Sequence, residues 1–89
     1  MKAVITVIGR DTVVVIARVS VVCAELNINI EDVTQSVMQE LFCMIMLVDL
    51  SGATADQAAI RDRFARLGDE MGMQVTLTRQ EVFDAMHTV

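Results

Sequence analysis

The sequence has few of the residues on which several classes of binding site depend. Its 89 residues include no proline, tryptophan or tyrosine, and only three phenylalanines, two cysteines and one histidine. An RNA-recognition domain would show exposed aromatic side chains on its central strands and a basic balance of charge. The formal net charge here is −5, and the densest cations, Arg61, Arg63 and Arg66, alternate with carboxylates as on a solvated helix face. We therefore expect no nucleic acid partner.

The scarcity of histidine and cysteine argues against catalytic and metal sites. His87 is the only histidine, and no nucleophile–base pair, glycine-rich phosphate loop or cluster of metal ligands is present. Cys23 and Cys43 lie in apolar segments at a spacing that matches no zinc or thioredoxin motif, and the Met-x-Cys-x-x-Cys motif of a metallochaperone is absent. We expect two buried free thiols. The sequence predicts a protein that is not an enzyme and has no metal or cofactor.

Long hydrophobic runs are also missing. No segment approaches the roughly 20 apolar residues of a membrane-spanning helix. The N-terminal segment MKAVITVIG is too short for the hydrophobic region of a signal peptide and ends at Arg10–Asp11. No proline-rich or low-complexity linker divides the chain. We expect one cytoplasmic domain over residues 1–89, with no membrane partner.

Apolar residues are nevertheless abundant, at 54% of the chain. The usual fraction is about 45–50%, and a chain this short can bury only a small core. The surplus indicates a second buried surface, most simply a homodimer interface. The alternative is a strand-rich core with both faces of the sheet covered.

The first half of the chain has the pattern strand, helix, strand, strand. Residues 3–8 form a short run that is apolar on both faces, which is typical of a central strand. A helical stripe follows (Ile16, Val19, Cys23 and Leu26), with Asp11 or Thr12 as N-cap. The run of β-branched residues 13–16 disfavours a helix, so a hairpin turning at Gly9 stays an alternative here. Residues 28–38 change parity near Glu31–Asp32, which predicts a bulge or a kink.

The second half completes the pattern with strand, helix, strand and a short tail. Residues 41–50 are nearly all apolar, after a hairpin at Gln39–Glu40. Thr54 and Gln57 fit a capping box, and a stripe leads to a C-terminal Gly72 (Ile60, Phe64, Leu67 and Met71). Residues 73–79 alternate as a half-exposed strand. The tail from Gln80 can form one or two amphipathic turns with Phe83, Met86 and His87.

This order of elements predicts an α+β, ferredoxin-like βαββαβ sandwich. Its four-stranded antiparallel sheet has two helices on one face, and a short C-terminal helix follows. The first and third strands are the most apolar, as the central strands of this topology should be. The apolar face of the sheet away from the two helices then needs a cover, which is a second argument for a dimer. Acylphosphatases share the topology, but the three residues Gly9-Arg10-Asp11 are not enough to identify their arginine-bearing phosphate loop.

With this topology, four segments of the chain resemble the ACT domain, a regulatory module that binds small molecules. They are AVITVIGRD at the start, AELNINIEDVTQ after the first helix, MIMLVDLS in the third strand and VFDAMH near the end. The whole chain is similar to the small stand-alone prokaryotic ACT proteins, an uncharacterised family. The resemblance implies a homodimer that binds an amino acid between its two domains.

The resemblance also implies which residues form the site. In ACT domains, the turn between the first strand and first helix meets the start of the partner's second strand. Here the turn comprises Gly9, Arg10, Asp11, Thr12, Val13 and Val14, and the partner's strand contributes Asn29 and Ile30. The N–H groups at the helix start would receive a carboxylate, Asp11 an ammonium group, and Asn29 would both donate and accept.

One residue departs from the family pattern. Val14 occupies the place of a glycine that lets the backbone approach the ligand closely. The added isopropyl group predicts weak or absent amino-acid binding. The alternative function is therefore a protein–protein module that docks on an enzyme or regulator without a ligand, for which seven methionines offer adaptable surfaces.

Overall fold

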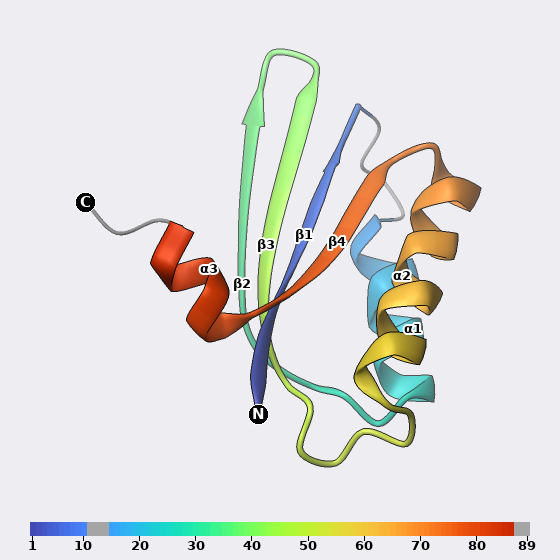
Figure 1. Ribbon diagram of the computed structural model, residues 1–89. Coiled ribbons are helices and arrows are strands. Elements are labelled where there is room, and N and C mark those ends of the chain that lie inside the picture. The colour runs from blue at the N-terminus through green and yellow to red at the C-terminus, as the bar shows by residue number, and fades with distance from the viewer. Residues whose placement is uncertain (11–14, 87–89) are drawn as a thin grey trace.

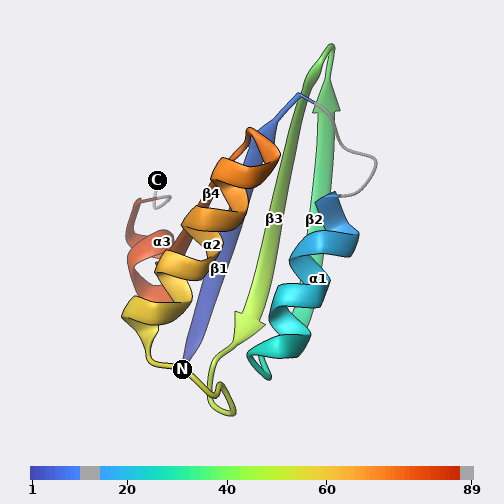
Figure 2. The same cartoon turned by 90° about the vertical axis from the view of Figure 1, so that its right-hand side faces the viewer.

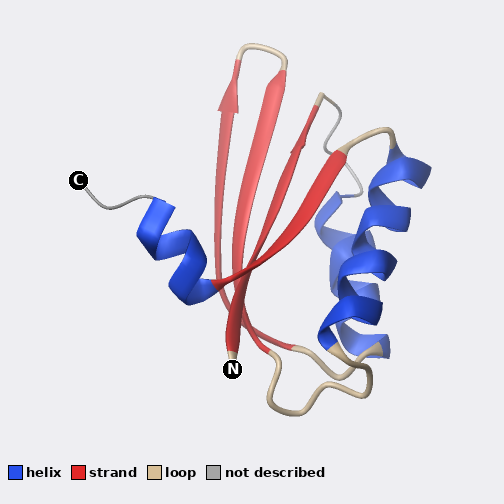
Figure 3. Cartoon of the chain, viewed as in Figure 1, coloured by secondary structure: helices blue, strands red, loops and turns tan. Residues whose placement is uncertain are grey.

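Seven helices and strands make up the chain in a computed structural model that describes residues 1–10 and 15–86 (Figures 1 and 3). In chain order they are β1 (Lys2–Gly9), α1 (Val15–Glu25), β2 (Asn29–Met38), β3 (Leu41–Asp49), α2 (Gln57–Met71), β4 (Gln74–Arg79) and α3 (Gln80–Met86). This order is the predicted βαββαβ pattern with a C-terminal helix. His87, in the predicted final turns, lies outside the described residues.

The four strands form one antiparallel sheet in the order β2-β3-β1-β4. The two most apolar strands, β1 and β3, are central as predicted, and the ferredoxin-like fold class is confirmed. α1 and α2 cover one face of the sheet, and α3 lies on the other (Figures 1 and 2). The parity change in β2 is a register shift between Ile30 and Asp32, which confirms the predicted bulge.

The hydrophobic core lies between the sheet and the α1–α2 layer. Alternate residues of the central strands point into it because successive side chains of a strand face opposite sides. They include Phe42 of β3, which is 2% exposed, and Phe64 of α2 in the same core is 0% exposed. Among residues 1–10 and 15–86, no polar or charged side chain is buried. The core is therefore held by apolar packing rather than by a buried polar network.

The predicted helix is confirmed for residues 15–25, against the hairpin alternative, but the predicted buried stripe was partly wrong. Val15, Val19 and Val22 are 0–2% exposed, whereas Ile16 is 38% exposed. The spacing from Val15 (i, i+4, i+7) fits a core-facing helix as well as the spacing from Ile16 does. Within a run of β-branched residues, hydrophobicity alone does not select between the two.

The predicted capping box of α2 was also wrong. Asp56, rather than Thr54, is the N-cap, and its Oδ1 accepts a hydrogen bond from the N–H of Ala59 at 2.8 Å. A carboxylate at this position both accepts the bond and meets the positive end of the helix dipole. The prediction at the other end is confirmed: Gly72 ends the helix with φ 67°, in the left-handed region that glycine favours.

The two cysteines differ in exposure. Both are free, as predicted, but only Cys23 is buried; Cys43, on the face of the sheet opposite α1 and α2, is half-buried. Cys43 therefore corrects the expectation of two buried thiols. Burial raises the pKa of the Cys23 thiol to about 11 from 9.0, because the thiolate would lose its hydration. The thiol of Cys23 stays protonated and unreactive at neutral pH.

We expect a maleimide at pH 8 to modify one thiol per folded chain, and replacement of Cys43 by serine to abolish that reaction.

The raised pKa of Cys23 also gives a pH dependence of stability. The contribution of Cys23 to the free energy of unfolding is complete below pH 9.0 and is lost between pH 9.0 and about 11. The loss amounts to about 3 kcal/mol. Denaturant titrations at pH 8 and pH 11, with a Cys23→Ser variant as control, measure it. Equal losses in both proteins would contradict this assignment to Cys23.

Candidate functional site

The first half of the predicted site lies at the C-terminal end of β1. Gly9 is the last residue of this strand, and the exposed Arg10 follows it. The other residues predicted for the turn (Asp11, Thr12, Val13 and Val14) lie outside the described residues. α1 is described from Val15, and its first turn holds no acidic side chain. The start of a helix supplies free N–H groups and a positive dipole end, which favour an anionic ligand.

Met73 is a neighbour of this turn that the sequence reasoning missed. A Cβ atom added to Gly9 would lie 2.4 Å from Cγ of Met73. The contact arises because β4 pairs with β1, with Gln74 opposite Ile8, so the preceding Met73 reaches the end of β1. The only feature of the sequence that could have indicated this contact is the position of Met73 directly after Gly72, which ends α2. Met73 is half-buried and packs against the core.

The second half of the predicted site lies at the opposite end of the sheet. Asn29 pairs with Asp49, whereas Gly9 pairs with Phe42, seven residues earlier on the same β3 strand. At about 3.3 Å per residue, the two ends are about 23 Å apart. One chain therefore does not bring Asn29 and Ile30 to the turn that starts at Gly9.

Ionic interactions surround Asn29 at its end of the sheet. Lys2 Nζ lies 2.9 Å from Oε1 of Glu31, and the hydrogen bond from Lys2 to this carboxylate raises the Lys2 pKa. The Ser51 hydroxyl donates to Oδ1 of Asp49 at 2.6 Å, and this bond lowers the pKa of Asp49. Both shifts stabilise the charged forms that the groups already have at neutral pH.

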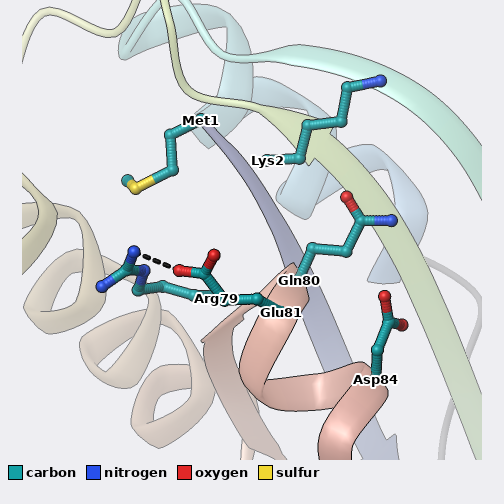
Figure 4. Close-up of a pocket in the computed structure, with 6 residues that line it drawn as sticks. All are labelled: Met1, Lys2, Arg79, Gln80, Glu81 and Asp84. Carbon is teal, nitrogen blue, oxygen red and sulfur yellow. Dashed lines mark ion pairs between the residues drawn. The ribbon is translucent and has the colours of Figure 1, made fainter.

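A polar hollow of about 380 Å³ opens beside these groups, between the start of β1 and α3 (Figure 4). It is lined by Met1, Lys2, Arg79, Gln80, Glu81 and Asp84. Its charges are engaged within the chain: Arg79 pairs with Glu81 and Lys2 with Glu31. None of the residues predicted for the ligand site lines this hollow, and we assign no ligand to it.

A second hollow of about 380 Å³ lies between α1 and α2 on the side away from the sheet. Its lining combines apolar and charged residues: Ala17, Arg18, Val21, Val22, Glu25, Arg63 and Leu67. Two ion pairs cross between the helices, Arg18 to Glu70 at 2.8 Å and Arg63 to Glu25 at 3.6 Å. These pairs join the two helices, so we interpret the hollow as part of the contact between α1 and α2 rather than as a ligand site.

Within residues 1–10 and 15–86, no three His, Cys, Asp or Glu side chains are grouped so that they could hold a metal ion. No described helix is long and apolar enough to cross a membrane.

The edge of the sheet near Asn29 is open along its whole length. β2 is an edge strand of 10 residues, and every residue of it except Ile30 is exposed. An edge strand presents unpaired N–H and C=O groups that another strand can pair with. This edge runs from the Asn29 end of the sheet to the end where Gly9 lies.

Comparisons with known proteins agree on one family. The model of the ACT domain family matches residues 2–78. UPF0237 proteins of Methanopyrus kandleri and Listeria monocytogenes are 44% identical over 88 residues and 42% identical over 87 residues, and each match covers at least 98% of both chains. The solved ACT domain protein from Streptococcus pneumoniae superposes with a TM-score of 0.82 at 35% identity, over 93% of each chain.

More distant structures share the fold alone. A formyltetrahydrofolate deformylase from Pseudomonas syringae matches with a TM-score of 0.78 at 21% identity; the match covers 88% of this chain but 27% of the deformylase. A putative glycine cleavage system transcriptional repressor matches at 20% identity with a TM-score of 0.70, over 89% of this chain and 45% of the repressor. In both, the matched fold is one part of a longer chain.

Proposed function

Since the chain belongs to the ACT domain family, we propose that it is a cytoplasmic, non-enzymatic regulatory module that binds an amino acid between two copies of itself. The observation that carries this proposal is the position of the two half-sites. Gly9 and Asn29 lie at opposite ends of one sheet, so a site that combines them would need a second chain.

The open β2 edge provides a way to join the halves. Antiparallel pairing of β2 with the same strand of a second chain, around a two-fold axis, places the start of one strand beside the end of the other. Val37, near the end of β2, lies opposite Phe42 and therefore in the same row as Gly9. The partner's Asn29 would then be about three strand spacings, or about 14 Å, from Gly9. A ligand bound between the two chains would occupy that interval.

Exposed apolar side chains along the same edge support the pairing. Val33 and Val37 face the helix side of the sheet, because they pair with Met46 and Phe42, yet they are 36% and 64% exposed. Ile16 of α1 is 38% exposed. A partner that extends the sheet at β2 would also continue the helix layer and cover these side chains. Removal of this apolar surface from water would favour the pair.

The expected ligand has both charges of a free amino acid. The helix N-terminus offers N–H groups to a carboxylate, and the Asp11 carboxylate offers a partner for an ammonium group. Asn29 of the second chain can bond either group. Binding would stabilise the pair of chains, and this coupling between ligand and association is the regulatory effect that we propose.

A second candidate function is a protein–protein module that works without a ligand. Val14 in place of the family glycine favours it, as do exposed apolar side chains such as Val21, which is 56% exposed. Stoichiometric co-purification with one protein, unchanged by added amino acids, would select this function over the first.

A mixing experiment tests the shared site. In a Val14→Gly background, Asp11→Ala and Asn29→Ala chains should each lose binding in calorimetric titration with a panel of amino acids. When the two are mixed and allowed to exchange, half of the pairs combine both chains, and each such pair regains one intact site. About a quarter of the original binding capacity should return. No recovery, despite exchange of chains, would contradict a site shared between two chains.

A further inference from the structure

Met73 lies against the last residue of β1, which has no side chain of its own. A Cβ atom added to Gly9 would lie 2.4, 2.8 and 2.9 Å from the Cγ, Cε and Sδ atoms of Met73. The methionine side chain therefore covers the Cα atom of Gly9 and takes the space that a side chain at this position would fill. An alanine at position 9 would have to displace it.

This contact lies on the side of the sheet that α1 and α2 cover. Successive residues of a strand face opposite sides, so Gly9 shares a side with Val7, which belongs to the core. The start of α1 and the end of α2 both point toward this end of the sheet (Figure 2). Met73 is thus close to the region where the proposed ligand would meet the free N–H groups of α1. Because Met73 is only half-buried, part of its side chain is accessible to such a ligand.

The neighbours of Gly9 across the sheet are apolar as well. Val37 pairs with Phe42, and Phe42 pairs with Gly9, so the three residues form one row across β2, β3 and β1. Met73 extends the row beyond Gly9. In the proposed pair of chains, a ligand that joins Gly9 to the partner's Asn29 would lie along this row. No residue of the row is charged, so a charged ligand side chain would lose hydration there without gaining an ionic partner from it.

We propose that Met73 determines which amino acid the site accepts, by selecting an aliphatic side chain and limiting its size. This inference rests on the proposed function and adds the chemical class of the ligand. An aliphatic side chain laid on the row would remove from water both Val37, which is 64% exposed, and the accessible part of Met73.

The size limit follows from the packing of Met73. Its side chain occupies the space over Gly9 and also packs against the core, so moving it aside would cost those contacts. A ligand with an aromatic ring would compete with the methionine for this space. Shortening Met73 should therefore open the site to larger ligands.

The test is a calorimetric titration of the Val14→Gly chain with leucine, phenylalanine, glutamine and lysine. Leucine should bind at least about tenfold more tightly than glutamine or lysine. Adding Met73→Ala should shift the ratio of the leucine and phenylalanine dissociation constants at least about tenfold in favour of phenylalanine. The ratio reports specificity, because a loss of stability alone would weaken both ligands alike.

Two further variants are the controls. Met73→Leu keeps a side chain of similar volume and should leave the ratio unchanged. Met71→Ala truncates another half-buried methionine, at the end of α2 and outside the row, and should also leave the ratio unchanged.

Two results would overturn this inference and leave the proposed function standing. One is binding of glutamine or lysine by the Val14→Gly chain as tightly as leucine; it involves no change at Met73, so it holds even if Met73→Ala fails to fold. The other is the same ratio in folded Met73→Ala and Met71→Ala chains. Absence of binding for every amino acid would instead refute the proposed function, and this inference with it.

Discussion

Replacing Gly68 by alanine is expected to lower the free energy of unfolding by about 2 kcal/mol. Gly68 lies in the last turns of α2, where β4 crosses closely. An added Cβ would be 2.7 Å from the backbone oxygen of Met73 and 3.2 Å from the backbone nitrogen of Val75. Overpacking costs about 1–3 kcal/mol, and we expect the upper end here because the backbone atoms that the Cβ meets cannot turn away. The gain in helix propensity of about 1 kcal/mol offsets part of this cost and leaves a loss of about 2 kcal/mol.

Thermal unfolding provides the measurement for Gly68→Ala. A loss of about 2 kcal/mol corresponds to a fall in Tm of about 8–16 °C for a chain of this size. Gly52→Ala is the matched control, because its added Cβ would meet the side-chain nitrogen of Asn27 at 3.2 Å and should cost under about 1 kcal/mol. An unchanged or higher Tm for Gly68→Ala would show that β4 does not approach α2 as closely as described.

Replacing Val14 by glycine is expected to raise the affinity for an amino acid by at least about tenfold, which is about 1.4 kcal/mol of binding free energy. The physical reason would be steric, because the resemblance to ACT domains implies a glycine at this position, where the backbone approaches the ligand closely, and valine adds an isopropyl group. Glycine should at the same time lower stability by up to about 1 kcal/mol, since the unfolded chain gains conformational freedom. Binding and stability are thus predicted to change in opposite directions.

Isothermal titration of both proteins with the same amino acid panel measures the first effect, and denaturant unfolding the second. Val13→Gly is the control: it carries the same entropic penalty at a neighbouring position and should not raise affinity. Tight binding by the unaltered chain, or equal gains from both glycine variants, would contradict the role assigned to Val14.

The sequence predicted the sheet well because its hydrophobic patterns are unambiguous. β1 and β3 are the most apolar segments and occupy the centre, and the parity change at Glu31–Asp32 is a bulge. The helix ends were less predictable. Thr54 and Asp56 are both good N-caps, and only the described geometry shows that Asp56 accepts the bond from Ala59. Local propensity does not decide between candidates that lie two residues apart.

The candidate site was predictable as two separate pieces. The resemblance to ACT domains implies the glycine turn and Asn29 as the two parts, but their separation of about 23 Å depends on strand pairing. The contact of Met73 with Gly9 also depends on it, since the two residues are distant in sequence and β4 alone brings them together. Contacts of this kind follow from the register of the sheet, which hydrophobic periodicity does not specify.

A cross-link between chains tests the central claim most directly. In a Cys43→Ser background, Arg10→Cys and Asn29→Cys chains are mixed and treated with a bis-maleimide. The reagent is chosen to span about 14 Å, the distance expected between the two positions on different chains, but not about 23 Å, their separation within one chain. The shared site predicts a covalent dimer of one chain of each kind. Absence of that dimer, from two folded variants that both react with the reagent, would contradict a ligand site built from the turn of one chain and Asn29 of another.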